Sequence, residues 1–143
     1  MAVDRQVLES LLNKLQKTLL KLDRMDFSSE ELREDEDLQD LVDRRLQIAI
    51  ETCIDMATHL ANGLNLPGRD IAGEVFKLLA EEKIIDSNLA EKMSRACGFR
   101  NILVHEYLMI DYNLVYENYK FNLDDLRDFA KAVVDFLEKN PQV

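Results

Sequence analysis

The sequence predicts an all-α fold, a bundle of four to six helices formed by one domain. Its 143 residues are the length of a single domain, and 47% hydrophobic with 32% charged residues is typical of a folded globule. Only four glycines and two prolines are present, whereas sandwiches and barrels need a turn signal about every ten residues. Apolar residues also recur at helical spacing along most of the chain.

The first element, residues 4–25, carries one apolar stripe at the spacing of a bundle helix. Its members are the leucines at positions 8, 12, 15, 19 and 22. Residues 26–29 break this pattern. Ser28 followed by Glu31 fits a capping box, which would begin the next helix.

The second helix is expected from near residue 30 or 37 to residue 61, and at 1.5 Å per residue it would be about 35 Å long or longer. Its apolar stripe consists of Val42, Leu46, Ala49, Cys53, Met56 and Leu60. Asn62 and Gly63 are expected to end it with a left-handed stop.

Shorter helices follow. Asp70 is expected to cap the next helix, and Asp86 or Ser87 the one after it. Gly98 is expected to interrupt that helix, and Asn122 to cap the last one. Residues 102–104 form the one β-branched cluster in the sequence and are too few for a strand.

The net charge of −10 argues against a general nucleic-acid binder. Residues 23–43 hold ten carboxylates and two arginines, whereas residues 92–105 contain three Lys or Arg and no acid. Acids favour helix starts through the helix dipole. The acidic segment therefore predicts a solvated helix start, or alternatively a docking surface for a basic partner or a screen against non-specific RNA.

Several classes of protein are disfavoured. No apolar run approaches the ~18 residues of a membrane span, and residues 1–5 lack a secretory signal. Cys53 and Cys97 make neither a disulfide framework nor a zinc site, and are expected to be small buried side chains in a reducing cytosol. There is no glycine-rich phosphate loop, and neither histidine follows a glutamate at the spacing of a di-iron bundle.

Glu51, Asp55 and His59 follow one another at four-residue intervals on the second helix. They form either a polar stripe that faces a cleft or partner, or a solvated face with local pairing. In the first case the two acids could orient Arg100 from the facing helix.

Residues 100–107, RNILVHEY, place a guanidinium, an amide, an imidazole and a phenol inside the acid-free window. On a straight helix Arg100 and His105 would lie about 140° apart, whereas Asn101 and His105 would align. Either the helix is deformed after Gly98, or the groups meet across a dimer. A buried turn with a hydrogen-bonded histidine is the simpler alternative.

This segment resembles the R-x4-H-x-Y signature of HEPN-domain toxins of the HepT type. The segment QIAIETCIDMATHL, residues 47–60, resembles the characteristic second helix of that family, and residues 76–85 and the chain length also match. The resemblance covers essentially the whole chain, so residues 1–143 are expected to form a single HEPN/HepT-like domain.

The resemblance implies a homodimeric, metal-independent endoribonuclease without a cofactor, the cytoplasmic toxin of a type VII-like toxin–antitoxin pair. Arg100 and His105 would be catalytic, because a guanidinium binds phosphate and an imidazole can act as base or acid near neutral pH. Asn101 would hold the phosphate or orient His105, with Glu51 and Asp55 in support. RNA cleavage needs both an acid and a base, and one motif histidine per chain independently predicts that two motifs meet in a dimer.

The resemblance also implies a partner, a cognate minimal nucleotidyltransferase antitoxin of the MntA kind that transfers AMP to Tyr107. A phenol is a poor base at neutral pH, so this tyrosine is expected to be a regulatory target. The alternatives are a non-catalytic helical subunit that binds nucleotide or substrate for a nucleotidyltransferase, and a plain helical adaptor. The intact trio Arg100, His105 and Tyr107 favours the nuclease.

Overall fold

The computed structural model describes residues 3–67, 72–105 and 109–143, and every regular element in these ranges is a helix. The all-α prediction is therefore confirmed. In chain order the helices are α1 (Arg5–Asp23), α2 (Ser29–Glu34), α3 (Glu36–Gly63), α4 (Ala72–Glu81), α5 (Ser87–Val104), α6 (Tyr112–Phe121) and α7 (Leu123–Lys139). The described ranges thus hold seven helices instead of the expected four to six.

Of the two expected starts of the second helix, the one near residue 37 agrees with α3, while residues 29–34 form the separate helix α2, divided from α3 at Asp35. Asp35 has extended backbone angles, and its carboxylate accepts a hydrogen bond from the Leu38 N–H at 3.1 Å, so it caps α3. The capping box before α2 is confirmed: the Glu31 N–H donates to Ser28 Oγ at 3.1 Å, and the Ser28 N–H donates to Glu31 Oε1 at 3.2 Å.

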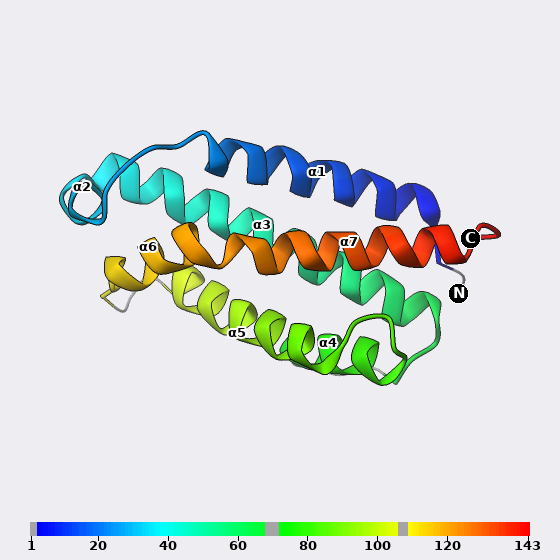
Figure 1. Cartoon of the computed structure of the whole chain (residues 1–143). Helices are drawn as coiled ribbons and strands as arrows, with labels where there is room; N and C mark the ends of the chain where they lie inside the picture. Colours follow the sequence, from blue (N-terminus) through cyan, green and yellow to red (C-terminus); the bar gives the residue numbers. More distant parts are fainter. Residues whose placement is uncertain (1–2, 68–71, 106–108) are drawn as a thin grey trace.

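Four long helices, α1, α3, α5 and α7, form the bundle, and α3 packs against the other three (Figure 1). Helix α4 packs on α5 and α3, and α2 packs on α6 at one end of the bundle. Because α6 follows α5, this same end receives the last turn of α5, where the R-x4-H residues lie. None of the described helices is long and apolar enough to cross a membrane.

A single apolar cluster fills the centre of the bundle. All six members of the predicted stripe on α3 are buried, and so are four of the five stripe leucines of α1, with Leu12 packed at the margin. Phe76 of α4 and Phe129 of α7 meet edge to face at 5.2 Å between ring centroids. The helical periodicity of the sequence thus predicted the buried faces correctly.

Two glycines have roles that differ from those expected. Gly63 still belongs to α3, and the left-handed residue after it is Asn65, with φ 56°. A Cβ on Gly63 would lie 2.7 Å from Val3 Cγ2, so the close approach of the N-terminal segment explains this glycine. Gly98 does not interrupt α5, which runs unbroken from Ser87 to Val104.

Of the remaining predicted caps, Asp86 caps α5 through the Leu89 N–H at 2.7 Å. Asn122 stands at the N-cap position of α7, but its side chain makes no capping hydrogen bond there. Asp70 lies outside the described residues.

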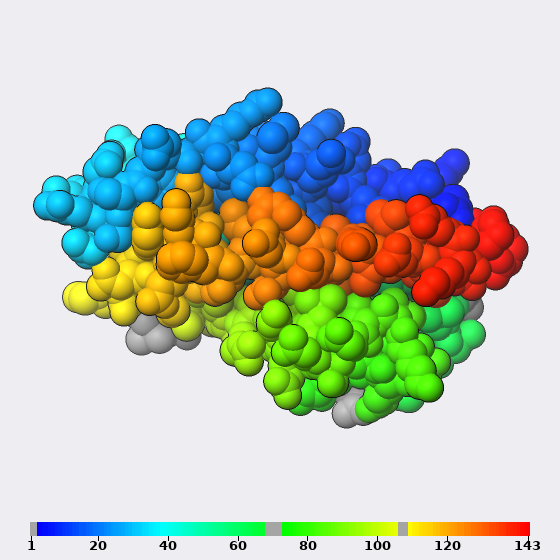
Figure 2. Space-filling model, viewed as in Figure 1, coloured from blue at the N-terminus to red at the C-terminus, as the bar shows by residue number. Residues whose placement is uncertain are grey.

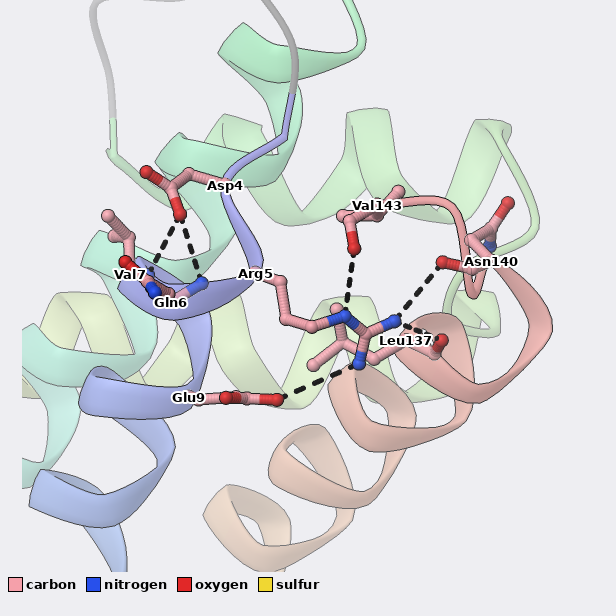
Figure 3. Close-up of polar contacts among 8 residues, drawn as sticks. All are labelled: Asp4, Arg5, Gln6, Val7, Glu9, Leu137, Asn140 and Val143. Carbon is pink, nitrogen blue, oxygen red and sulfur yellow. Dashed lines mark hydrogen bonds and ion pairs between the residues drawn. The ribbon is translucent and has the colours of Figure 1, made fainter.

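Arg5, at the start of α1, holds the end of α7 (Figure 3). Its Nη2 donates to the carbonyls of Leu137 at 2.8 Å and Asn140 at 3.2 Å, and its Nε donates to the Val143 carbonyl at 2.8 Å. Glu9 adds a looser ion pair at 3.7 Å. Carbonyls at a helix end lack the usual partners one turn ahead. Leu137 and Asn140 accept only turn hydrogen bonds here, from the Asn140 N–H at 3.3 Å and the Val143 N–H at 3.0 Å, and the guanidinium adds a charged donor to each.

We expect Arg5→Ala to lower the free energy of unfolding by about 1–3 kcal/mol, because several charge-assisted hydrogen bonds are lost together. Urea denaturation followed by circular dichroism measures this. Glu9→Ala is the matched control and should change stability by less than about 0.5 kcal/mol, since its ion pair is exposed. Equal losses in the two variants would contradict this role of Arg5.

Candidate functional site

Helix α5 places Arg100 on its inner side, toward α3. The Arg100 Nη1 atom lies 3.6 Å from Glu51 Oε1, and the Arg100 side chain is 22% exposed. Glu51 Oε1 in turn accepts a hydrogen bond from Gln47 Nε2 at 3.1 Å. The structure therefore brings Arg100 and Glu51 together from facing helices, as the sequence suggested.

The Arg100 guanidinium is held mainly by charge attraction. At 3.6 Å its contact with Glu51 is longer than a normal hydrogen bond. Its buried Nε atom has no hydrogen-bond partner among the described residues. A buried donor without a partner costs about 1–3 kcal/mol, so the position of Arg100 is not explained by folding alone. Its donors retain capacity for an anion such as a phosphate group.

His105 lies at the other side of the same helix end. It is the C-cap of α5, its N–H donates to the Asn101 carbonyl at 3.0 Å, and both residues are exposed. Because α5 is regular up to this cap, Asn101 and His105 lie one turn apart on one face, whereas Arg100 points inward. The expected deformation after Gly98 is absent, so Arg100 and His105 of one chain do not share a face.

The connection from α5 to α6 contains Tyr107, which lies outside the described residues. Its far end is anchored: Asp111 caps α6 through the Asn113 N–H at 2.9 Å. One residue later, the Tyr112 hydroxyl donates to Asp43 Oδ2 of α3 at 2.7 Å. Asp43 is only 9% exposed, so this contact fixes the start of α6 against the core.

The polar stripe on α3 is longer than the sequence analysis recognised. Asp43 and Gln47 precede Glu51, Asp55 and His59 at the same interval of four residues, so this spacing was the signal that could have identified them. His59 Nε2 accepts a hydrogen bond from the Asp4 N–H at 2.9 Å and so supports the start of α1. Asp55 is exposed, and no ion pair or hydrogen bond joins it to Arg100 in the described ranges.

Both cysteines are buried inside the bundle as free thiols. Burial raises the pKa of Cys97 to about 11 and raises the pKa of Cys53 further still. Neither thiol is therefore a nucleophile at neutral pH. Among the described residues, no three His, Cys, Asp or Glu side chains are grouped as a metal site.

Residues 9–133 match the model of the family described as ribonuclease HepT-like. The chain belongs to this family. The resemblance found in the RNILVHEY and QIAIETCIDMATHL segments is thereby confirmed. The HepT-like match spans α3 and α5 completely, and with them Glu51, Arg100 and His105.

Named HepT relatives support the same assignment. The mRNA nuclease HepT of Shewanella oneidensis is 30% identical over 103 residues, which is 72% of this chain and 77% of that protein. The tRNA nuclease HepT of Aphanizomenon flos-aquae is 29% identical over 97 residues, 68% of this chain and 66% of that protein.

A solved HepT-type structure supports the fold. It is the tri-AMPylated HEPN toxin of Shewanella oneidensis in complex with an MNT antitoxin, with a TM-score of 0.85 and 23% identity. The alignment covers 92% of this chain and 99% of that one. The bundle therefore has the same fold as that protein.

The acidic segment, residues 23–43, forms the end of α1, all of α2 and the start of α3. Several of its acids have structural partners: Asp23 pairs with Arg127 of α7, Glu31 completes a capping box, and Asp35 caps α3. These contacts favour the interpretation as a helix start. The segment also lies at the end of the bundle that carries the motif, because α2 packs on α6.

We expect both thiols to resist labelling by a disulfide reagent such as DTNB in the native protein at pH 8. At three pH units below a pKa of about 11, about one Cys97 thiol in a thousand is deprotonated. After unfolding in guanidinium chloride, two thiols per chain should react, which the absorbance of the released thionitrobenzoate would show. Rapid stoichiometric labelling of the folded protein would contradict the conclusion that both thiols are unreactive.

Proposed function

We propose that this chain is the toxin of a toxin–antitoxin pair and acts as a metal-independent endoribonuclease in the cytoplasm. The observation that carries the proposal is a HepT-like bundle in which Glu51 holds Arg100, whose buried Nε has no hydrogen-bond partner among the described residues, while His105 stands exposed at the same helix end. These are the two groups that phosphodiester cleavage without metal requires.

The reaction proposed is attack of the ribose 2′-oxygen on the adjacent phosphorus. The 2′-hydroxyl loses its proton to a base, and the bond from phosphorus to the 5′-oxygen breaks. That oxygen takes a proton from an acid, which leaves a 2′,3′-cyclic phosphate and a 5′-hydroxyl. Arg100 binds the non-bridging phosphate oxygens through its forked donors. Glu51 keeps the guanidinium at the helix end and acts as a positioning residue, with Asp55 as a weaker candidate for that role.

One His105 cannot supply base and acid at the same moment. We propose that a homodimer brings two motifs together, so that one histidine takes the proton and the other gives one. Asn101, one turn before His105 on the same face, would hold the phosphate or orient the imidazole. The exposed apolar side chains on both sides of His105 support this arrangement, since Val104 is 43% and Met109 100% exposed.

Neutralisation is proposed to occur through Tyr107. A cognate nucleotidyltransferase of the MntA kind would transfer AMP from ATP to the phenol oxygen and release pyrophosphate. The phosphodiester adds about one negative charge close to Arg100, where it would occupy the site of the RNA phosphate. The AMPylated state of the Shewanella toxin supports this proposal.

We expect Arg100→Ala and His105→Ala each to reduce RNA cleavage about 10²- to 10⁴-fold without unfolding the protein, because Arg100 would stabilise charge on the phosphate and His105 would transfer a proton. The assay is total RNA with purified protein in EDTA, followed by mapping of fragment ends. His59→Ala is the matched control and should retain cleavage, because His59 supports α1 and lies away from the motif. A folded His105→Ala protein that cleaves normally would refute the catalytic role of His105, whereas a folded wild type that cleaves no RNA would point to a non-catalytic binding subunit.

We expect Tyr107→Phe to keep most of the nuclease activity but to escape neutralisation by the nucleotidyltransferase and ATP. Intact mass after co-expression should show one or more added AMP groups on the wild-type chain and none on Tyr107→Phe. A neutralised wild-type toxin of unmodified mass would mean that the antitoxin acts by simple occlusion.

A further inference from the structure

A groove of about 750 Å³ opens between α5, α6 and α7. One wall is α5 and the other is formed by α6, Asn122 and the start of α7, while Leu46 and Ile50 of α3 lie at its bottom. The three helices that form the walls meet on the face shown in Figure 2. No step of the proposed reaction uses this groove.

The charge of the groove is opposite to that of the chain. Lys92 and Arg95 line it from α5, and both belong to the acid-free window 92–105. Asp125 faces them from α7, with its Oδ1 atom 3.9 Å from Lys92 Nζ. The groove thus holds two cations against one carboxylate in a chain of net charge −10.

An aromatic ring lies at the rim of the groove. Phe121, the last residue of α6, is 69% exposed although it is large and apolar. Beside it the amides of Asn118 and Asn122 line the groove and are linked by a hydrogen bond of 3.2 Å. Cations that track a backbone, combined with an exposed ring on which a base can stack, are the features of grooves for single-stranded nucleic acid.

The groove also leads to the motif. Gly98 and Ile102 line it, and they precede His105 by seven and three residues on α5. Seven residues at about 100° each place Gly98 and His105 within about 20° of each other around the axis of α5. A Cβ on Gly98 would meet nothing within 4 Å. A helix-interior glycine costs about 1 kcal/mol relative to alanine, and packing among the described residues does not explain the glycine at position 98.

We propose that this groove binds the single-stranded RNA segment that flanks the scissile phosphate. A base stacks on Phe121, the phosphates pass Lys92 and Arg95, and the strand crosses the open surface at Gly98 on its way to His105. The inference rests on the proposed function, since it gives the substrate of that reaction its binding groove.

The first test measures binding apart from cleavage. The probe is a fluorescein-labelled RNA strand of about 16 nucleotides and randomised sequence. Its fluorescence anisotropy is measured while the His105→Ala protein is added. Adding Phe121→Ala should weaken binding about 5- to 150-fold, the effect of losing one stacked base. Adding Arg95→Ser should weaken it and reduce the slope of log Kd against log salt by about 0.7. Leu20→Ala and Lys17→Ser, exposed positions on α1, are the matched controls and should bind as the parent does.

A second variant separates blocking from misfolding. Gly98→Leu should stabilise α5, because leucine is the better helix former, yet its side chain would project into the groove. We expect a higher urea midpoint together with RNA binding weakened at least tenfold.

Cleavage then separates this inference from the proposed function. Dinucleoside monophosphates are too short to fill the groove, so Phe121→Ala should lower the cleavage of longer RNA much more than it lowers the cleavage of dinucleoside monophosphates. A wild type that cleaves neither substrate would refute the proposed function, while the binding titration would still test the groove. Unchanged RNA affinity in all three groove variants would overturn the groove assignment. So would a change from dimer to monomer in Phe121→Ala, since a second copy would then occupy the groove.

Discussion

The geometry of this protein depends on the regular rotation of α5. The helix runs unbroken through Gly98 to the cap at His105, so residues five positions apart cannot share a face. Arg100 therefore points to α3, where Glu51 meets it, while His105 and Asn101 are exposed at the helix end. One chain thus presents the proposed phosphate-binding group and the proposed proton-transfer group on different sides, and a second chain is the simplest way to join them.

Helix α3 positions the other elements around that constraint. Its polar stripe has one side chain every four residues, and members that lie about two turns apart contact different elements. Asp43 anchors α6 through Tyr112, Glu51 meets Arg100 of α5, and His59 supports the start of α1. The opposite stripe of α3 is buried in the core. The same helix thus stabilises the bundle and aligns the elements on both sides of the motif.

Periodicity predicted the helices, their buried faces and most of their starts, because apolar spacing and capping residues act locally. The errors have two sources. Gly63 is explained by a distant contact, the approach of Val3, and not by a left-handed turn. Asp35 separates α2 from α3 through a local capping hydrogen bond, which apolar spacing does not reveal. The pair Glu51–Arg100 could be anticipated from charge, whereas the groove beside Phe121 could not. It depends on how three helices meet, and the spacing within one helix does not contain that information.

The claim that two chains complete one site is tested most directly by mixed dimers. Arg100→Ala and His105→Ala proteins, each inactive alone, would be unfolded together, refolded to exchange protomers, and assayed on RNA in EDTA. If Arg100 of one chain acts with His105 of the other, each heterodimer keeps one composite pair, so the mixture should regain activity above either parent. The recovery should stay below the wild type, because the heterodimer lacks the second His105. If Arg100 and His105 act within one chain, heterodimers shown to be present by differential tagging would remain as inactive as the parents, and the composite site would be refuted.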